Sequence, residues 1–192
     1  MARLHLASTS PRRHELLRQI GLSPLPLMVA VDESVLPGES AADYVRRLAV
    51  AKAEAGVHRL GHDQDWVLAA DTTVFAGGEI LGKPADFDDA RRIWALLPSS
   101  DHQVLTGVAL IHQGRTLAQV VTTRVIFQAM PDAEQQAYWR SGEPQDKAGG
   151  YAIQGRAALY VAAIEGSYSN VVGLPLAETA ELLRRCQFPL WE

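Results

Sequence analysis

Hydroxyl and arginine side chains follow the first apolar stretch of the chain, where they could bind an anion. After Leu4 to Ala7 the sequence continues as Ser8-Thr9-Ser10-Pro11-Arg12-Arg13. Ser10 is placed to cap a helix that begins at Pro11, because proline suits the first helical position. Hydroxyls, unpaired backbone N–H groups and two arginines at a helix N-terminus suit phosphate oxygens. The alternative is a capped surface helix with two solvated arginines.

Two carboxylates are candidates for metal binding or proton transfer. Asp71 interrupts an apolar run, with Val67 to Ala70 before it and Val74-Phe75 shortly after it. A buried carboxylate needs a partner, and a metal ion, a lysine or a water could supply one. The alternative is an aspartate that ends a strand and bonds its own backbone. Glu33 is a second candidate metal ligand, and a solvated loop is its alternative.

Two lysines could bring positive charge to the same ligand. Lys52 lies at the edge of the buried face of a predicted helix, and its alternative is a lysine whose ammonium reaches solvent. Lys83 lies in a stiff Gly82-Lys83-Pro84 corner that would hold its ammonium at a fixed point. Most such corners are turns without a ligand.

The segment from Asp146 to Gly155 carries the highest density of candidate binding residues. Gly149 and Gly150 would let backbone approach a ligand closely, and Lys147 adds charge. Tyr151 offers a ring, and Gln154 offers a donor and an acceptor that could read a base edge. The alternative is a glycine-rich hairpin with a buried tyrosine.

Composition excludes several classes of protein. The chain has 192 residues, 47% hydrophobic and 21% charged, which is typical of an ordinary globular protein. A net charge of −4 argues against a surface that coats nucleic acid. No window predicts a membrane span, and the N-terminal apolar stretch is too short for a signal peptide. The single cysteine, Cys186, excludes an intrachain disulfide and fits a cytoplasmic protein.

Helical and strand-like patterns alternate along the chain and predict a mixed α/β fold with at least one long antiparallel pair. We expect helices at 11–20, 40–56, 87–97, 132–139 and 175–186. We expect strands at 4–7, 66–75, 80–81, 103–112, 117–128 and 157–164. In the strand at 117–128, Val121, Thr123, Val125 and Phe127 should share one face.

In combination, these segments resemble the Maf family of nucleoside triphosphate pyrophosphatases. The resemblance runs in order along nearly the whole chain. It rests on Leu6-Ala7-Ser8-x-Ser10-Pro11-Arg12-Arg13, Ala70-Asp71-Thr72, Leu81-Gly82-Lys83-Pro84, Asp146-Lys147-Ala148-Gly149-x-Tyr151-x-Ile153-Gln154-Gly155 and Gly173-Leu174-Pro175.

The resemblance implies an elongated, two-lobed single domain over residues 1–192. A central bent mixed sheet, flanked by helices, and a cleft between the lobes would be similar to inosine triphosphate pyrophosphatases. It also implies a cytoplasmic, metal-dependent hydrolase that releases a monophosphate and pyrophosphate. The most similar subgroup acts on dTTP and UTP, with a house-cleaning role against non-canonical pyrimidine nucleotides. Many members of the family form homodimers.

Carried over by position, the resemblance makes Asp71 the proton acceptor and gives Glu33 and Asp71 to the metal. It assigns phosphate binding to Ser8, Arg12, Arg13, Lys52 and Lys83, and substrate choice to Arg12, Thr72 and Gln154. Asp146, Lys147, Gly149 and Tyr151 belong to the nucleotide loop. Gly150 and Ala152 depart from the family, where alanine and glycine respectively are more usual, which leaves the base preference open.

Oxygen ligands favour Mg²⁺ or Mn²⁺, whereas no Cys/His spacing predicts zinc. Two other functions remain as alternatives to the pyrophosphatase. A non-catalytic nucleotide-binding regulator of cell division and septum formation would bind nucleotides without turnover. A phosphomonoesterase would release orthophosphate.

Overall fold

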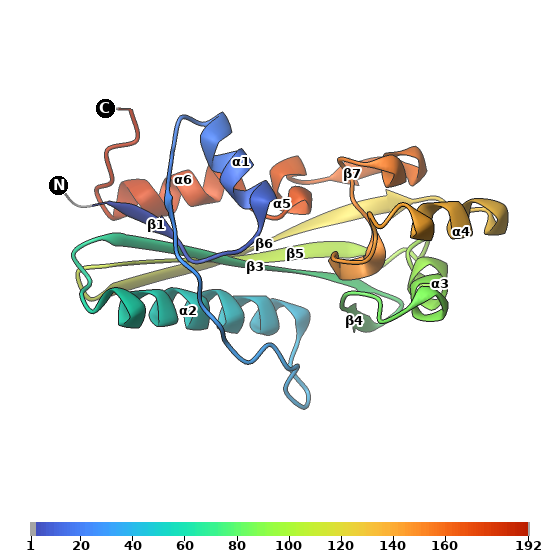
Figure 1. Ribbon diagram of the computed structural model, residues 1–192, viewed down its shortest axis with the longest axis horizontal. Helices are drawn as coiled ribbons and strands as arrows, with labels where there is room; N and C mark the ends of the chain where they lie inside the picture. Colours follow the sequence, from blue (N-terminus) through green and yellow to red (C-terminus); the bar gives the residue numbers. More distant parts are fainter. Residues whose placement is uncertain (1–2, 192) are drawn as a thin grey trace. The chain divides into compact units, whose positions relative to one another are not determined.

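The computed structural model describes residues 3–191, which form a mixed α/β fold (Figure 1). The strands are β1 (Leu4–Leu6), β2 (Leu25–Pro26), β3 (Trp66–Ala76), β4 (Glu79–Leu81), β5 (Gln103–His112), β6 (Arg115–Phe127) and β7 (Val161–Glu165). The α-helices are α1 (Pro11–Gln19), α2 (Ala41–Leu60), α3 (Phe87–Leu96), α4 (Asp132–Arg140), α5 (Tyr168–Val172) and α6 (Leu176–Arg185). Within residues 3–191, no helix combines the length and apolar character needed to cross a membrane.

The strands of residues 3–191 form one mixed sheet in the order β2-β1-β3-β5-β6-β7, and β4 pairs with β3. Strand β1 is parallel to β2 and to β3, and its Leu6 lies opposite Leu68. The β3–β4 and β6–β7 pairs are antiparallel. Gln113 and Gly114, both with positive φ, form the two-residue turn between β5 and β6. The predicted mixed α/β class is therefore confirmed.

The chain divides into two compact units. The first holds the described residues up to Asp71, then Thr106–Val121, and the residues from Gly173 onward. The second holds Thr72–Leu105 and Thr122–Val172. Strands β3, β5 and β6 each contribute residues to both units. That the whole chain acts as a single domain with a cleft stays a prediction.

In the first unit, α2 packs closely against the sheet (Figure 1). A Cβ on Gly56 would lie 2.7 Å from Val67 Cγ1, and one on Gly107 would lie 2.2 Å from the carbonyl oxygen of Val45. The sequence pattern ended this helix near Gly56, which was wrong. Gly56 is a close-packing residue inside the helix, and α2 ends at Leu60, followed by the C-cap residue Gly61, whose φ of 73° is left-handed.

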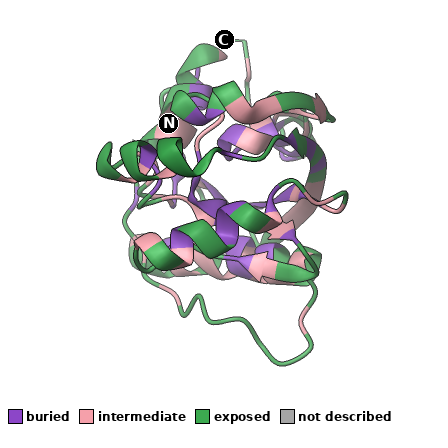
Figure 2. Cartoon of the chain, turned by 90° about the vertical axis from the view of Figure 1, so that its right-hand side faces the viewer, coloured by how far each residue is buried: buried purple, intermediate pink, exposed green. Residues whose placement is uncertain are grey.

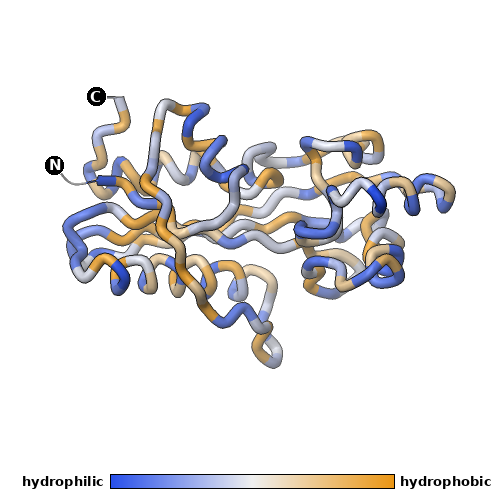
Figure 3. The backbone as a smooth tube through the Cα atoms, viewed as in Figure 1, coloured by the Kyte–Doolittle hydropathy of each residue, from blue (hydrophilic) through white to orange (hydrophobic). Residues whose placement is uncertain are grey.

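The second unit has its own apolar core, with Trp94, Val125, Phe127, Tyr138 and Tyr151 among its buried residues. Strand β5, which belongs to both units, is apolar and buried along most of its length. Figure 3 shows hydrophobic residues recurring along the central strands. On β6 the expected alternation is confirmed for Thr123, Val125 and Phe127, which are buried while their neighbours are exposed, whereas Val121 is only partly buried.

Three further elements differ from the sequence-based expectation, one of them α5 (Tyr168–Val172), a short helix that the pattern did not predict. The strand expected at 157–164 begins only at Val161, because Arg156–Tyr160 forms a 3-10 turn. An apolar run of this length fits either state, and the pattern alone does not separate them. Strand β2 was missed because two residues are too short for a periodic signal, and its pairing with β1 joins segments distant in sequence.

Candidate active site

Lys52 brings the two candidate carboxylates of the first unit together. Its Nζ lies 2.6 Å from Oδ1 of Asp71 and 2.6 Å from Oε1 of Glu33. Asp71 is buried, whereas the Glu33 side chain is 55% exposed. The lysine is thus the partner that the buried carboxylate required. Two alternatives from the sequence are wrong: Lys52 does not extend to solvent, and Asp71 does not end its strand, since β3 continues to Ala76.

The parallel pairing of β1 with β3 carries the Ser8 loop toward Asp71. The N–H of Ala7 donates to the carbonyl oxygen of Leu68 at 2.8 Å, so β1 ends beside the part of β3 that leads to Asp71. Ligands of α/β sheets commonly bind outside the carboxyl ends of parallel strands. Ser8 and the start of α1 lie at this position in the first unit.

Ser8 and Arg13 form the fixed part of this loop. The Ser8 hydroxyl oxygen accepts from Arg13 Nη1 at 3.0 Å and from the N–H of Ser10 at 3.2 Å. Nε of Arg13 donates to the carbonyl oxygen of Gly173 at 2.8 Å, which ties the loop to the segment before α6. Ser10 is the N-cap residue and Pro11 the first helical residue, as expected, but the Ser10 side chain makes no capping bond.

The groups around Arg13 shift the pKa of its guanidinium in opposite directions. Removal from solvent lowers the pKa of its guanidinium, whereas the nearby carboxylates of Asp71 and Glu33 raise it and the positive Arg12 lowers it. Arg13 therefore lies within electrostatic range of both carboxylates and of Arg12. An anionic ligand bound beside the two arginines would relieve their mutual repulsion.

The carboxylates fit a hard divalent cation. Mg²⁺ is usually held by one or two carboxylates together with water and substrate phosphates. Glu33 and Asp71 supply two carboxylates, which both contact the Lys52 ammonium. Throughout residues 3–191 there is no group of three or more His, Cys, Asp or Glu side chains that could hold a metal ion. A cation here would therefore take its remaining ligands from water and a phosphorylated ligand.

In the second unit, Glu143 and Tyr138 hold the glycine-rich loop. The Tyr138 hydroxyl donates to Oε1 of Glu143 at 2.8 Å and accepts from the N–H of Ala152 at 3.2 Å. Oε2 of Glu143 accepts from the N–H of Arg156 at 3.1 Å. A Cβ on Gly155 would lie 2.3 Å from this carboxylate, so the contact requires glycine.

Tyr151 is buried in the core of the second unit, as the alternative interpretation of this segment expected. Nδ1 of His102 lies 3.0 Å from the carbonyl oxygen of Leu97, which can only accept, so Nδ1 carries the hydrogen. Nε2, 3.0 Å from the Tyr151 hydroxyl, is then the acceptor. Burial lowers the pKa of His102 to about 4 and keeps the ring neutral, so this bond persists at neutral pH.

The remaining loop residues are bound to one another. Nζ of Lys147 donates to the carbonyl oxygen of Glu143 and to Oδ1 of Asp146. The N–H of Gly149 donates to the carbonyl oxygen of Gly82 at 3.0 Å, which joins the loop to the corner that carries Lys83.

The structure brings five of the predicted residues into two contact groups of the first unit. Glu33, Lys52 and Asp71 form one group, and Ser8 and Arg13 form the other. Lys83 and Gln154 are exposed residues of the second unit, and Thr72 is the first residue of that unit. The functional roles of all these residues stay predictions.

Several residues whose hydrogen bonds hold these loops were not singled out from the sequence. In the first unit these are Glu39, Tyr44 and Arg47, and in the second they are Trp94, His102, Tyr138 and Glu143. His102 carried no signal of a polar residue in an apolar context, because it follows directly on the polar segment 99–101. Arg47 and Glu39 carried no such signal, because charged residues at a helix start are ordinary.

The chain is similar to known proteins over nearly its whole length. A family described as Maf-like protein matches residues 3–186. A dTTP/UTP pyrophosphatase of Hahella chejuensis is 50% identical over 190 residues, 98% of this chain and 94% of that protein. A protein of the same name from Anaeromyxobacter dehalogenans is 53% identical over 195 residues, 99% of this chain and 97% of that protein. A solved nucleoside-triphosphatase / dITP/XTP pyrophosphatase from Mycobacterium abscessus aligns with 97% of this chain and 94% of its own, at 16% identity and a TM-score of 0.43.

Proposed function

Because the chain belongs to the family of Maf-like proteins, we propose that it hydrolyses a nucleoside triphosphate to the nucleoside monophosphate and pyrophosphate. Its relatives are named dTTP/UTP pyrophosphatases, and we propose dTTP and UTP as its substrates. The observation that carries the proposal is the position of Lys52 between Glu33 and Asp71. It joins a buried and an exposed carboxylate in the same unit as the Ser8–Arg13 loop.

Cleavage of a phosphoanhydride requires the protein mainly to place a water and to neutralise charge on phosphate oxygens. Lys52 holds Oδ1 of Asp71, and we assign Oδ2 as the acceptor of the proton from the attacking water. Ser8, Arg12, Arg13, Lys52 and Lys83 would bind phosphate oxygens. Arg13 has a second task, since it orients the Ser8 hydroxyl.

Glu33 and Asp71 are the residues that would hold Mg²⁺ or Mn²⁺. Such a cation, when bound, favours ionisation of a water and neutralises phosphate charge. The oxygen donors described above support this assignment, and a pyrophosphatase of this kind would lose activity in a chelator.

We assign substrate choice to Arg12, Thr72 and Gln154. Gln154 is exposed, and its amide can both donate to and accept from a pyrimidine edge. Asp146, Lys147 and Gly149 would shape the nucleotide loop, and Tyr151 would contribute by holding this loop from the core.

The proposed activity is tested with a nucleotide panel that includes dTTP, UTP, purine triphosphates and modified pyrimidines. Pyrophosphate and orthophosphate are measured separately, with Mg²⁺ and with EDTA. We expect pyrophosphate release from dTTP and UTP that EDTA abolishes. Orthophosphate release alone would indicate a phosphomonoesterase, and tight binding without turnover would indicate the non-catalytic regulator of septum formation.

Asp71→Asn should abolish turnover while nucleotide binding remains nearly intact, because the change removes a proton acceptor and a negative charge. General bases contribute roughly 10²- to 10⁴-fold to rate, and we expect a loss in this range. Asp88→Asn, at an exposed position of α3, is the matched control. Full activity of Asp71→Asn would remove Asp71 from the chemistry.

We also propose a cytoplasmic location, which the single free cysteine, Cys186, supports. Assembly into a homodimer remains a proposal from family resemblance, and light scattering of the purified chain tests it.

A further inference from the structure

The loop that carries Glu33 lacks a core of its own. Every residue from Asp32 to Gly38 is exposed, including Val35 and Leu36, which are 50% and 48% exposed. In Figure 2 this segment is the loop at the bottom of the view, and it is coloured mostly as exposed. Segments with few buried apolar contacts open at low free-energy cost unless other interactions hold them. Glu33 nevertheless must keep its carboxylate at Lys52, so the contacts that fix the loop matter to the site.

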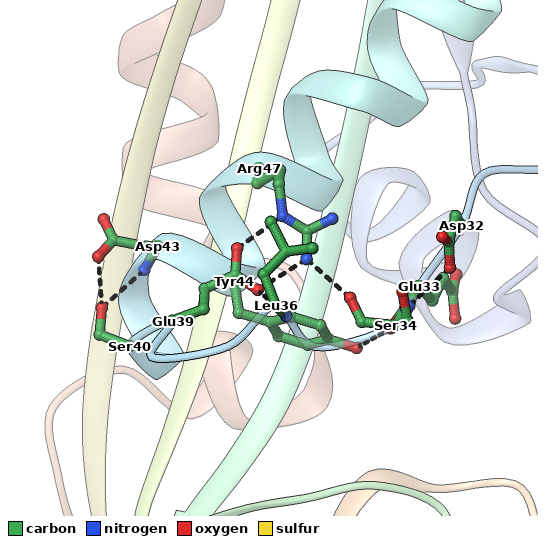
Figure 4. Close-up of polar contacts among 9 residues, drawn as sticks. All are labelled: Asp32, Glu33, Ser34, Leu36, Glu39, Ser40, Asp43, Tyr44 and Arg47. Atoms are coloured by element: carbon green, nitrogen blue, oxygen red, sulfur yellow. Dashed lines mark hydrogen bonds and ion pairs between the residues drawn. The ribbon is translucent and has the colours of Figure 1, made fainter.

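Arg47 of α2 binds both sides of this loop (Figure 4). Its Nε and Nη2 donate to the two carboxylate oxygens of Glu39 at 2.6 and 2.7 Å, and Nη2 also donates to the carbonyl oxygen of Ser34 at 2.9 Å. Oε2 of Glu39 in turn accepts from the N–H of Leu36 at 3.0 Å. A two-point Arg–carboxylate pair is geometrically specific, and the Glu39 side chain is only 7% exposed.

Tyr44 holds the backbone of Glu33 itself. Its hydroxyl donates to the Glu33 carbonyl oxygen at 2.9 Å, and its ring lies 5.6 Å from the Arg47 guanidinium carbon. Tyr44 and Arg47 are three residues apart on α2 and therefore share one side of the helix. The contacts of Tyr44 and Arg47 flank the Glu33–Ser34 peptide, while Lys52 of the same helix binds the Glu33 carboxylate.

We propose that Tyr44, Arg47 and Glu39 are positioning residues that keep the Glu33 carboxylate at Lys52 and Asp71. They act on the loop backbone and do not contact the nucleotide. The inference rests on the proposed function, because it assigns Glu33 a part in the site. These three residues would affect the activity only through the position of Glu33.

The first test compares Tyr44→Phe, Arg47→Met and Arg47→Lys with Arg46→Met. Arg46 is the exposed neighbour of Arg47 on the same helix and is the matched control. Partners that orient metal ligands typically change metal affinity or activity about 10- to 100-fold. We expect Tyr44→Phe and Arg47→Met to raise the Mg²⁺ concentration for half-maximal pyrophosphate release about 10-fold. Arg47→Lys should recover part of this loss, and Arg46→Met should match wild type.

The second test measures hydrogen exchange of the loop without nucleotide. The amides of Ser34 and Leu36 donate to Asp32 and Glu39, so a peptide over 32–38 reports directly on loop order. We expect exchange about 10-fold faster in Arg47→Met and clearly faster in Tyr44→Phe, with no change in Arg46→Met. Unchanged exchange in both variants would overturn the proposal, as would faster exchange with an unaltered Mg²⁺ requirement.

The two tests separate failure of this inference from failure of the proposed function. If wild type releases no pyrophosphate from any nucleotide, the proposed function is wrong, while the exchange rates still decide whether these residues hold the loop. A purely structural role would lower the melting temperature of Arg47→Met while leaving the Mg²⁺ requirement at the wild-type value. That result would also contradict the proposal.

Discussion

Lys52 forms ion pairs with both candidate carboxylates of the first unit, Glu33 and Asp71. Its side chain is 13% exposed, and its ammonium contacts a buried and an exposed carboxylate at equal distances. The interaction with Asp71 matters most for stability, because a buried charge without a partner is costly. Glu33 is half exposed and remains hydrated when its partner is lost. Screening by water therefore weakens the contribution of the Lys52–Glu33 pair to stability.

Removal of Lys52 should therefore destabilise the fold as well as the activity. We expect Lys52→Met to lower the free energy of unfolding by about 3 kcal/mol, because Asp71 becomes an unpaired buried charge. The double variant Lys52→Met/Asp71→Asn should recover much of this loss, since the buried charge is then gone. Urea unfolding of both variants and of Asp71→Asn checks this. Equal destabilisation of the single and double variants would contradict the assigned pairing.

The glycine-rich loop of the second unit is held by elements around it. Trp94 of α3 donates from Nε1 to the carbonyl oxygen of Gly150 at 2.7 Å, and Tyr138 of α4 binds Glu143 and Ala152. Gly150 has a φ of 62°, a left-handed conformation that suits glycine better than alanine. Glycine at this position, where the family more usually has alanine, thus agrees with the backbone observed here.

Two glycines near this loop form a matched pair for a test of packing. Gly149 has a φ of 72° and Gly142 a φ of 75°. A Cβ on Gly149 would lie 2.8 Å from Val74 Cγ2, whereas one on Gly142 would meet nothing within 4 Å. Left-handed alanine costs roughly 1–2 kcal/mol. We expect Gly142→Ala to lose about this much and Gly149→Ala about 1–3 kcal/mol more from overpacking.

Chemical denaturation of the two variants measures the difference. Nucleotide turnover should also fall more in Gly149→Ala, because the displaced loop includes Lys147 and Gln154. Equal stabilities of the two variants would contradict this expectation, because they would show that the loop accommodates the added methyl group beside Val74 without a loss of stability.

At the scale of the whole molecule, buried ionisable groups make stability depend on pH. Burial lowers the pKa of His102 from 6.5 to about 4. The unfolded chain therefore binds a proton that the folded chain excludes between these values, and stability falls as the pH falls through this window. The hydrogen bonds from Arg47 lower the pKa of Glu39 from 4.5 to about 2. The stability that this contact contributes is therefore lost at lower pH, as the pH falls between these two values.

We expect wild type to lose up to about 3 kcal/mol of unfolding free energy through His102 between pH 6.5 and pH 4. His102→Gln should unfold more easily at neutral pH but show a flatter pH dependence across this window. His58→Gln, at an exposed position of α2, serves as the control and should keep the wild-type slope. Unfolding by urea at a series of pH values gives both slopes, and an unchanged slope in His102→Gln would contradict the assignment.

Periodicity predicted the elements whose burial is regular. Strand β5 has the expected bounds and β3 extends one residue further, because continuous apolar runs with β-branched residues have few other solutions. Arg156–Tyr160 and β2 were not predictable, since the first fits two backbone states and the second depends on a partner strand. Gly56 was misjudged because its neighbour, Val67, is distant in sequence.

The sequence alone determined the element types, the family resemblance and the residue types available for phosphate and metal binding. These follow from local periodicity and from motifs that lie within short segments. Tertiary structure decided that Lys52 binds Asp71 and Glu33, that Arg47 binds Glu39 across the loop, and that Tyr151 lies in the core against His102. The physical reason is that the energy of a charge or a hydroxyl depends on its partner and its solvent exposure, and the fold sets both by joining distant segments.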